Sequence, residues 1–556
     1  MENERKTING ELFKKMITGG VANLHANVQE VNDLNVFPIP DGDTGENMYL
    51  TLHGGYDELQ QNTENSVEKE ADALAKGMLL GARGNSGVIL SQLFYGLAEG
   101  LKGFSESVTI KDFASALKKG VQCAYGSVAR PVEGTILTVA REATDNAYKR
   151  ITDSTNVEEF FSMFLEEMKI SLEKTPDLLP VLKESGVIDS GGAGLVYIIE
   201  GFFKALCGME IAGGNEIQAS DKKALDFSQF TENDVMQFGY CTELLLRLQT
   251  SKTDVDAFSV DSLIEFLESI GDSVVAFKTG TIIKIHVHTL TPYKVLEHCQ
   301  KFGEYLTVKI ENMTLQHNET HQEEKKQTFK KPQRTRRKFA VVTVASGEGL
   351  IKTFEEMGAD YVISGGQTNN PTSEDFIEAF DFVNADYVFV LPNNSNIIMA
   401  AKQAASFYKN SDIRVIESKN IGQGYSILAM LDFDSDDADA ICQEMTANMQ
   451  NTVTGMIAKS VRTTTVNGVD VKKDEFMGFT DKTMHVSDAD KVIAAEKLLE
   501  KLDIANKEFL ITVNGKTATT KEKALLVGYL SEKYPYLEVY EIEGGQDVYD
   551  FLFIIE

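Results

Sequence analysis

The stretch Leu34–Met48, LNVFPIPDGDTGENM, carries the sharpest chemical signal in this 556-residue chain. Its two prolines keep the first half out of a helix, and Asp41 and Asp43 flank a single glycine. In a turning backbone both carboxylates can face one point, and Mg²⁺ typically binds one or two carboxylates together with phosphate oxygens. A helical pattern, ENMYLTLHGGYDEL, starts at Glu46. The positive end of that helix would face the same point and suit a phosphate.

The aspartate string also has an ordinary explanation. Aspartate and threonine are common helix N-caps, and a turn containing Asp and Gly needs no ligand to account for it. The string taken alone therefore leaves a simple capped turn open beside a metal site.

Apolar residues recur three and four positions apart from Asn9 to about Cys207, and β-branched runs are sparse there. This periodicity predicts a bundle of helices. Three further glycine loops interrupt it: GARGNSG at Gly81–Gly87, RPVEGT at Arg130–Thr135 and DSGGAG at Asp189–Gly194. Loops held by a rigid scaffold are where binding residues concentrate, so we expect the chemistry to lie in these four loops.

The string FPIPDGDTGENM, followed by these three loops in order, resembles the dihydroxyacetone kinase nucleotide-binding subunit superfamily (DhaL-like). Within it, the string is most similar to the bacterial fatty acid kinase catalytic (ATP-binding) subunit. The resemblance implies an all-α antiparallel helical barrel over residues 1–210. It also implies ATP or ADP bound at one rim, with Mg²⁺ between aspartates and phosphates.

Carried over by position, the resemblance makes Asp41 and Asp43 the metal ligands and catalytic residues. Dihydroxyacetone kinases have a third aspartate shortly before this pair, where this chain offers the neutral oxygen of Asn35. Arg83 is a candidate for stabilising the transferring phosphate, and a purely structural role fits it equally well. The remaining nucleotide and phosphate contacts would come from Thr44, Gly45, Asn47, Asn85, Ser86, Thr135, Asp189 and Gly191.

Residues 222–315 are predicted to form a small α+β domain. The strand IIKIHVHT places His286 and His288 on one face, and Cys241 in the strand GYCTELLL offers a third ligand for Zn²⁺. Surface histidines without a metal remain an alternative, as do histidines that contact the transferred phosphate. The pattern resembles the fatty acid kinase middle domain, which implies a metal-bearing domain important for activity.

The polar, highly charged residues 316–338 predict a linker. Residues 339–556 alternate short apolar strands with helices, which predicts a mainly parallel, helix-flanked α/β domain. This part resembles the DegV-like fold, and in fatty acid kinases that implies a partner-binding domain. The loop Ser364–Pro371, SGGQTNNP, follows a strand with small polar residues that can bind anions.

Composition narrows the function further. The formal net charge of −30 disfavours nucleic acid and anionic membrane surfaces as partners. Five scattered cysteines fit a reducing cytoplasm. The sequence contains no run of about 18 apolar residues, so it predicts no integral membrane segment.

The resemblance implies a kinase with a carboxylate acceptor. ATP would phosphorylate a fatty acid bound to a carrier protein of the DegV family, giving acyl phosphate for phospholipid synthesis, and a homodimer is expected. Two rival functions remain: a kinase of dihydroxyacetone or another small polyol, and a lipid-regulatory protein that senses nucleotide.

Overall fold

The structure is a computed structural model of the whole chain, and it describes residues 5–35, 43–62, 66–209, 240–312 and 335–555, a few single positions excepted. The chain forms two compact units. One unit comprises residues 1–220 together with 332–556, and the other comprises residues 221–331. The two chain segments that the sequence assigns to the kinase and DegV-like domains thus pack together, and each unit is described by itself below.

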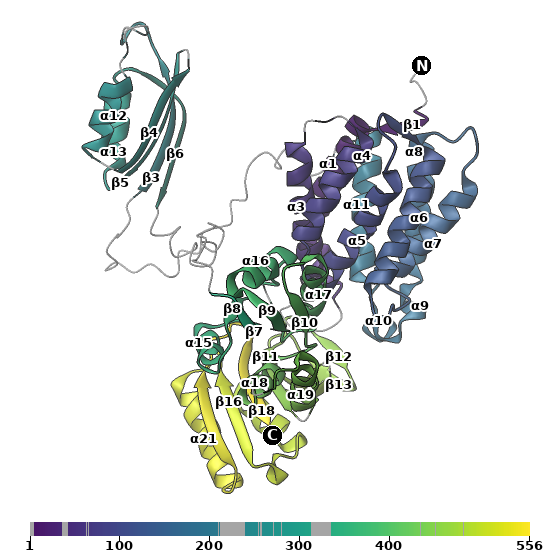
Figure 1. Cartoon of the computed structure of the whole chain (residues 1–556), viewed down its shortest axis with the longest axis vertical. Helices are drawn as coiled ribbons and strands as arrows, with labels where there is room; N and C mark the ends of the chain where they lie inside the picture. The colour runs from purple at the N-terminus through teal and green to yellow at the C-terminus, as the bar shows by residue number, and fades with distance from the viewer. Residues whose placement is uncertain are drawn as a thin grey trace. The chain divides into compact units, whose positions relative to one another are not determined.

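Residues 7–206 form the helical domain (Figure 1). Side-chain caps fix several helix starts: Asn9 accepts from the N–H of Leu12, and Asn156 and Glu159 form a reciprocal capping box. The elements are β1 (Thr7–Asn9), α1 (Gly10–Ala26), α2 (Val28–Asp33), α3 (Thr44–Gln61), α4 (Val67–Leu80), α5 (Gly84–Leu101), β2 (Ser107–Thr109), α6 (Ile110–Ser127), α7 (Ile136–Arg150), α8 (Val157–Glu173), α9 (Thr175–Leu178), α10 (Pro180–Ser185) and α11 (Ser190–Leu206).

The longer helices close into a ring around one apolar core. Neighbours along the chain pack against each other from α3 to α8, α11 packs on α8, and α1 closes the ring between α11 and the α3–α4 pair. Only three residues join α4 to α5, so the chain reverses between them. Buried side chains from all of these helices, Phe13, Met48, Phe161 and Phe202 among them, form a single core. This is the helical barrel that the family resemblance implies.

The middle unit is a four-stranded antiparallel sheet with the strand order β4-β5-β3-β6. Its face carrying Ile283, Ile285 and Val287 is buried in one core with Leu263 of α12 and Val295 of α13. The elements are β3 (Tyr240–Leu248), α12 (Val260–Glu268), β4 (Asp272–Thr279), β5 (Ile282–Thr289), α13 (Pro292–Cys299) and β6 (Gly303–Asn312). The α+β class expected for this region is confirmed.

The C-terminal part begins with a parallel sheet of strand order β10-β9-β7-β8. Its central strands are almost wholly apolar, as expected for strands covered on both faces. β7 begins at Arg337, so the predicted linker 316–338 overlaps the first two residues of this strand. The elements are β7 (Arg337–Ala345), α15 (Glu348–Glu356), β8 (Tyr361–Ser364), α16 (Ser373–Val383), β9 (Ala385–Leu391), α17 (Ile398–Phe407), β10 (Asp412–Val415), α18 (Ile421–Ala429) and α19 (Ala438–Gln450).

A second, six-stranded sheet follows, with the order β15-β14-β11-β18-β16-β17. All of its pairs are antiparallel except β16 with β17, so the expectation of a mainly parallel sheet holds only for the first sheet. The strands are β11 (Val453–Lys459), β14 (Phe476–Thr480), β15 (Thr483–Asp488), β16 (Phe509–Asn514), β17 (Glu538–Glu543) and β18 (Tyr549–Ile555). The hairpin is β12 (Thr464–Val466) with β13 (Val469–Val471), and the helices are α20 (Lys491–Lys501) and α21 (Thr520–Lys533).

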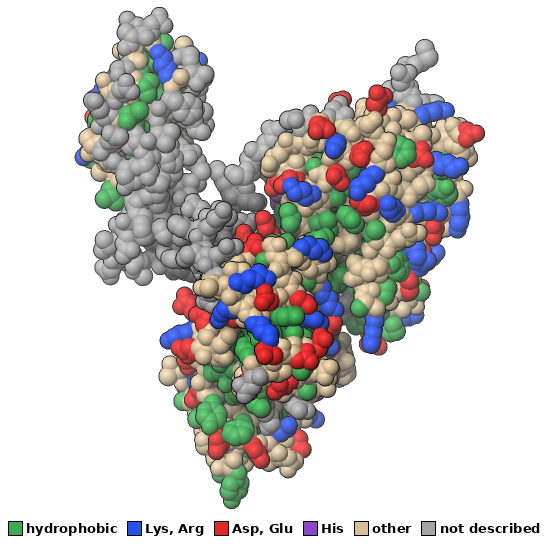
Figure 2. Space-filling view, viewed as in Figure 1, with side chains coloured by type: hydrophobic (Ala, Val, Ile, Leu, Met, Phe, Trp, Pro, Cys, Tyr) green, Lys and Arg blue, Asp and Glu red, His purple; other side chains and the backbone are tan. Residues whose placement is uncertain are grey.

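Figure 2 shows acidic and basic side chains interspersed over the visible face of the helical domain and of the C-terminal sheets. The excess of acidic residues is therefore not gathered into one patch on that face. Among the described residues, none of the helices has both the length and the apolar character needed to span a bilayer.

Candidate functional site

The four glycine loops meet at one rim of the helical barrel, because each of them leads into a helix. Ser190 at the start of α11 donates to the hydroxyl of Thr44 at the start of α3, at 3.4 Å. Asp189 accepts hydrogen bonds from the backbone N–H groups of Gly192 in α11 and Ile136 in α7. At the start of α5, Gly84 lies against Asn47 of α3. Four helix N-termini, each with a positive dipole end, therefore converge.

Two asparagines hold the first turn of α3 through hydrogen bonds. Thr44 donates to Oδ1 of Asn35 at 2.7 Å, and the backbone N–H of Gly45 donates to Oδ1 of Asn32 at 2.7 Å. A Cβ atom at Gly45 would lie 2.4 Å from the carbonyl oxygen of Val28, so only glycine fits there. These contacts hold the start of α3 at the rim.

Asp43 precedes α3 as its N-cap, yet its side chain makes no capping hydrogen bond. The carboxylate instead accepts a hydrogen bond from the side-chain amide of Asn370, on the loop between β8 and α16. Asp41, the other predicted metal ligand, lies outside the described residues. Asp43 is thus the predicted metal ligand that the structure places at the rim.

The predicted third metal ligand, Asn35, already has a structural role. Its Oδ1 accepts from Thr44 at 2.7 Å and lies 3.5 Å from the hydroxyl oxygen of Ser190, while its amide nitrogen donates to the carbonyl of Asn32. Asn35 therefore joins the starts of α3 and α11.

The start of α5 carries two more of the predicted nucleotide residues, Asn85 and Ser86. Gly84 has φ +57°, a left-handed conformation that favours glycine, and a Cβ there would lie 2.6 Å from Nδ2 of Asn47. Asn85 donates to Asn396 of the C-terminal part at 3.4 Å, and its own Oδ1 is buried without a hydrogen-bond partner. Ser86 lies in the first turn of α5, and Arg83 is the N-cap of this helix.

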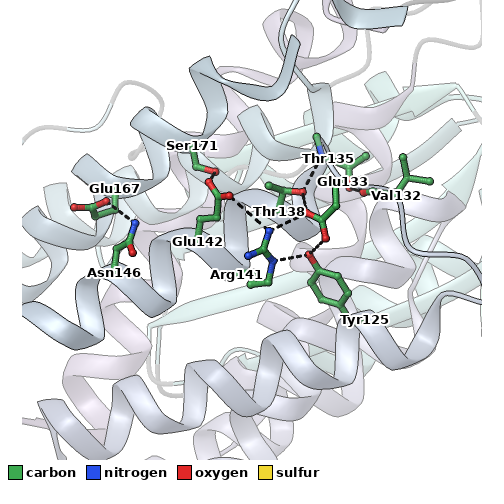
Figure 3. A network of polar contacts seen from close by, with 11 residues as sticks. Tyr125, Val132, Glu133, Thr135, Thr138, Arg141, Glu142, Asn146, Glu167 and Ser171 are labelled. Carbon is green, nitrogen blue, oxygen red and sulfur yellow. Dashed lines mark hydrogen bonds and ion pairs between the residues drawn. The ribbon is translucent and has the colours of Figure 1, made fainter. Parts of the chain in front are cut away.

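The loop before α7 is braced by a polar network around Glu133 (Figure 3). Its carboxylate accepts from Thr138 at 2.5 Å, from Arg141 at 2.9 Å and from Tyr125 at 3.0 Å. Partial burial acts to raise the pKa of Glu133, but these three hydrogen bonds hold it below its ordinary value. The network fixes Thr135, the N-cap of α7, whose hydroxyl donates to the carbonyl of Val132.

The carboxyl group of Asp189 is strongly perturbed by its surroundings. Withdrawal from water raises its pKa to about 6, although the N–H groups of Gly192 and Ile136 act in the opposite direction. Gly191 follows it in the first turn of α11, with room for a Cβ no closer than 3.3 Å to Ile136. Asp189 thus joins the starts of α7 and α11 and carries a carboxyl group that titrates closer to neutrality than an ordinary aspartate.

The C-terminal part reaches this rim at several points that the sequence did not predict. Gln403 of α17 donates to the carbonyl of Leu79 at 2.8 Å and accepts from Gln92 at 2.9 Å. Arg462 donates to the carbonyl of Asp33 at 3.1 Å. Ala82 and Val88 of the helical domain belong to the same apolar cluster as the parallel sheet. No local pattern signals these contacts, because they join residues more than 300 positions apart.

The predicted zinc residues lie in register in the middle unit. Cys241 on β3 is the direct antiparallel partner of His288 on β5, and His286 is paired with Glu243. The side chains of Cys241, His286 and His288 lie outside the described residues. Where side chains are described, no group of three or more His, Cys, Asp or Glu residues is arranged to hold a metal. The zinc site therefore stays a prediction.

The rim fits a divalent cation with an attached phosphate. Asp43 supplies an anionic oxygen, and the buried Oδ1 atoms of Asn370 and Asn85 lack hydrogen-bond partners. Oxygen ligands of this type suit Mg²⁺, and the converging helix starts suit phosphate oxygens.

Three stretches of the chain match models of known protein families. Residues 38–204 match the DAK2 domain, residues 237–320 match the middle domain of the FakA-like fatty acid kinase family, and residues 340–556 match the C-terminal domain of the same family.

Among curated proteins, YloV of Bacillus subtilis (strain 168) is 40% identical over 98% of this chain and 99% of its own length. An uncharacterized protein of Staphylococcus aureus (strain USA300) is 38% identical over 99% of each chain.

Two kinds of solved structure are similar to separate parts of the chain. DegV, a fatty acid binding protein from Bacillus subtilis, has 14% identity and a TM-score of 0.30, covering 39% of this chain and 99% of that one. The dihydroxyacetone kinase from C. freundii in complex with AMP-PNP and Mg²⁺ has 16% identity and a TM-score of 0.29, covering 37% and 35%. On the sequence relatives and the three matched domains, the chain belongs to the FakA-like fatty acid kinase family.

Proposed function

We propose that this chain is the ATP-binding catalytic subunit of a fatty acid kinase. It transfers the γ-phosphoryl group of ATP to the carboxylate of a fatty acid held by a separate carrier protein of the DegV family. A bond forms between a carboxylate oxygen and the γ-phosphorus, the bond to the β,γ-bridging oxygen breaks, and the products are acyl phosphate and ADP. The acyl phosphate would then serve phospholipid synthesis.

The observation that supports this proposal best is the convergence of four helix starts beside Asp43. Phosphoryl transfer depends mainly on positioning and on neutralising phosphate charge, and helix N-termini with a carboxylate for Mg²⁺ provide both. A fatty carboxylate is already a nucleophile, so no general base has to be found. Mg²⁺, when bound, would neutralise charge on the phosphates.

Individual residues take the following roles in this proposal. Asp43, together with Asp41, would hold the cation. Arg83, as the N-cap of α5, would stabilise the transferring phosphate. The nucleotide and its phosphates would contact Thr44, Gly45, Asn47, Asn85, Ser86, Thr135, Asp189 and Gly191. A homodimer, a cytoplasmic location and zinc in the middle unit remain predictions from the sequence.

A turnover assay tests the function directly. The purified full chain is incubated with ATP, Mg²⁺ and a fatty acid, with and without a purified DegV-family carrier, and acyl phosphate is trapped with hydroxylamine. We expect acyl hydroxamate only when the carrier is present. Phosphorylation of dihydroxyacetone in place of the fatty acid would support the polyol kinase, and the absence of any transfer would support the nucleotide sensor.

A further inference from the structure

Asn370 is a buried side chain whose amide oxygen makes no hydrogen bond. Only 2% of the residue is exposed. Its amide nitrogen donates to a carboxylate oxygen of Asp43, while its Oδ1 is buried without a hydrogen-bond partner. A buried acceptor left unpaired costs free energy, and such groups in folded proteins call for an explanation such as a bound ion.

Asn35, which the sequence offers as the third metal ligand, does not have an unpaired oxygen of this kind. Oδ1 of Asn35 already accepts a hydrogen bond from the hydroxyl of Thr44, and the amide nitrogen of Asn35 donates to the carbonyl of Asn32. Asn370 has the free oxygen that Asn35 lacks, and it lies beside the same Asp43 carboxylate.

The loop that carries Asn370 is held firmly on both sides. The N–H of Gly366 donates to the carbonyl of Asn369 at 3.0 Å, which tightens the loop after β8. Thr372 and Asp375 form a capping box that fixes the start of α16, and the N-cap Thr372 lies two residues beyond Asn370. Asn370 thus occupies a preorganised position, as binding residues require.

The position also suits a ligand site because of the sheet topology. In open parallel sheets, ligands bind outside the carboxyl ends of the strands. Asn370 follows the carboxyl end of β8, and Asn396 follows that of β9. Both contact the rim of the helical domain, at Asp43 and Asn85 respectively. The carboxyl-end edge of the parallel sheet, where such folds bind ligands, therefore contacts the rim of the helical domain.

We propose that Asn370 completes the divalent-cation site of Asp43 through its Oδ1, so that the helical domain and the C-terminal part share one metal site. This inference rests on the proposed function. An amide oxygen is an accepted ligand for hard cations and adds no charge. Docking of the C-terminal part and binding of Mg²⁺ then favour each other, since coupling between two binding events is reciprocal.

The test measures how much Mg²⁺ is needed to half-saturate binding of a fluorescent, non-hydrolysable ATP analogue to the full chain. Asn370→Ala should raise that concentration about 10-fold or more, the usual effect of disturbing a metal's surroundings. Asn370→Asp keeps the oxygen and loses the amide N–H, so it should need no more Mg²⁺ than the unsubstituted chain. Asn369→Ala, exposed in the same loop, is the matched control and should change nothing. Thermal unfolding verifies that each variant is folded.

Two results would overturn the inference. If Asn370→Ala left the Mg²⁺ requirement unchanged, Asn370 would not be a ligand of the cation. If Asn370→Asp needed as much Mg²⁺ as Asn370→Ala, the amide N–H would matter for binding and the oxygen would not. Failure of the proposed function looks different: the unsubstituted chain would then form no acyl hydroxamate from a carrier-bound fatty acid, whatever Mg²⁺ concentration it needs to bind the analogue.

Discussion

The hydroxyl of Ser190 donates to that of Thr44 at 3.4 Å, which joins the first residues of two helices that begin 146 residues apart. Each of these helices is preceded by an aspartate, Asp189 and Asp43. Two carboxylates and two positive helix ends are thereby brought to one place. This combination suits a cation that carries a polyphosphate better than it suits a cation or an anion alone.

Asp43→Asn should abolish most of the transfer activity. The substitution keeps the size of the side chain and removes the anionic oxygen that would hold the cation. Loss of one electrostatic group aimed at a reacting phosphate typically lowers kcat about 100-fold or more. Acyl hydroxamate formation measures the effect. Glu46→Gln, an exposed acid in the first turn of the same helix, is the control and should retain full activity. Equal activity in both variants would exclude a role for Asp43 in transfer.

Gly84→Ala should destabilise the start of α5 and weaken nucleotide binding. The residue has φ +57°, and a new Cβ would lie 2.6 Å from Nδ2 of Asn47. The backbone strain alone should lower the free energy of unfolding by about 1–2 kcal/mol. Gly103→Ala isolates that strain, because Gly103 has φ +91° and no atom within 4 Å of the new Cβ. Urea unfolding and binding of a fluorescent ATP analogue separate the two effects. A binding loss of equal size in the control would contradict the role of Asn47.

Asp189→Asn should flatten the pH dependence of stability between about pH 4 and pH 6. The pKa of Asp189 in the folded chain is about 6, against an ordinary value of 3.8, chiefly because of burial. In that window the folded chain therefore holds a proton that the unfolded chain has released. The contribution of Asp189 to the free energy of unfolding must therefore fall as the pH rises through this window and stay level above about pH 6. Asparagine still caps α11 but cannot titrate.

The measurement is urea unfolding of both proteins at several pH values across this range. The difference between the two stability curves isolates residue 189 from the other carboxyl groups. Parallel curves would mean that the carboxyl of Asp189 titrates at an ordinary pKa.

The helices of the first domain and the loops that precede them were predictable from the sequence, because both depend on local patterns. Apolar spacing determined the helices, and each glycine loop marks the start of one. That the loops meet was implied only by the family resemblance. The structure supplies the physical link, through Ser190 with Thr44 and through Asp189 with Ile136.

The contribution of the C-terminal part to the rim could not be predicted in this way. The loop containing Asn370 was recognisable as a polar loop after a strand, but its contact with Asp43 spans 327 residues. No periodicity or spacing encodes such a contact. The same holds for the antiparallel second sheet, because alternation of strands and helices does not reveal that β18 pairs between β11 and β16.

Zinc in the middle unit is tested by metal analysis. The register that pairs Cys241 with His288 puts these residues directly opposite each other on neighbouring strands, with His286 two positions away on the same face. We expect about one zinc per chain in protein purified without added metal. His288→Ala should lose it, and His298→Ala on α13 should keep it. If both variants contained the same amount of zinc, His288 would not be a zinc ligand.

Gln403→Leu should loosen the contact between the C-terminal part and the helical domain. Gln403 is 6% exposed and bonds to the carbonyl of Leu79 and to Gln92. Leucine keeps the volume and leaves these partners unpaired, which costs about 1–3 kcal/mol for a buried polar group. Amide hydrogen exchange should then rise in the residues of α17 and at the end of α4.

The same substitution should also raise the Mg²⁺ concentration needed for nucleotide binding, although Gln403 contacts neither Asp43 nor Asn370. The reason is linkage: Asn370 reaches Asp43 only while the two parts are docked, so weaker docking lowers the population that binds metal. Lys402→Ala, the exposed neighbour on α17, loses only a surface ion pair with Glu417 and is the control. Faster exchange in Gln403→Leu with no change in the Mg²⁺ requirement would show that docking and metal binding are independent.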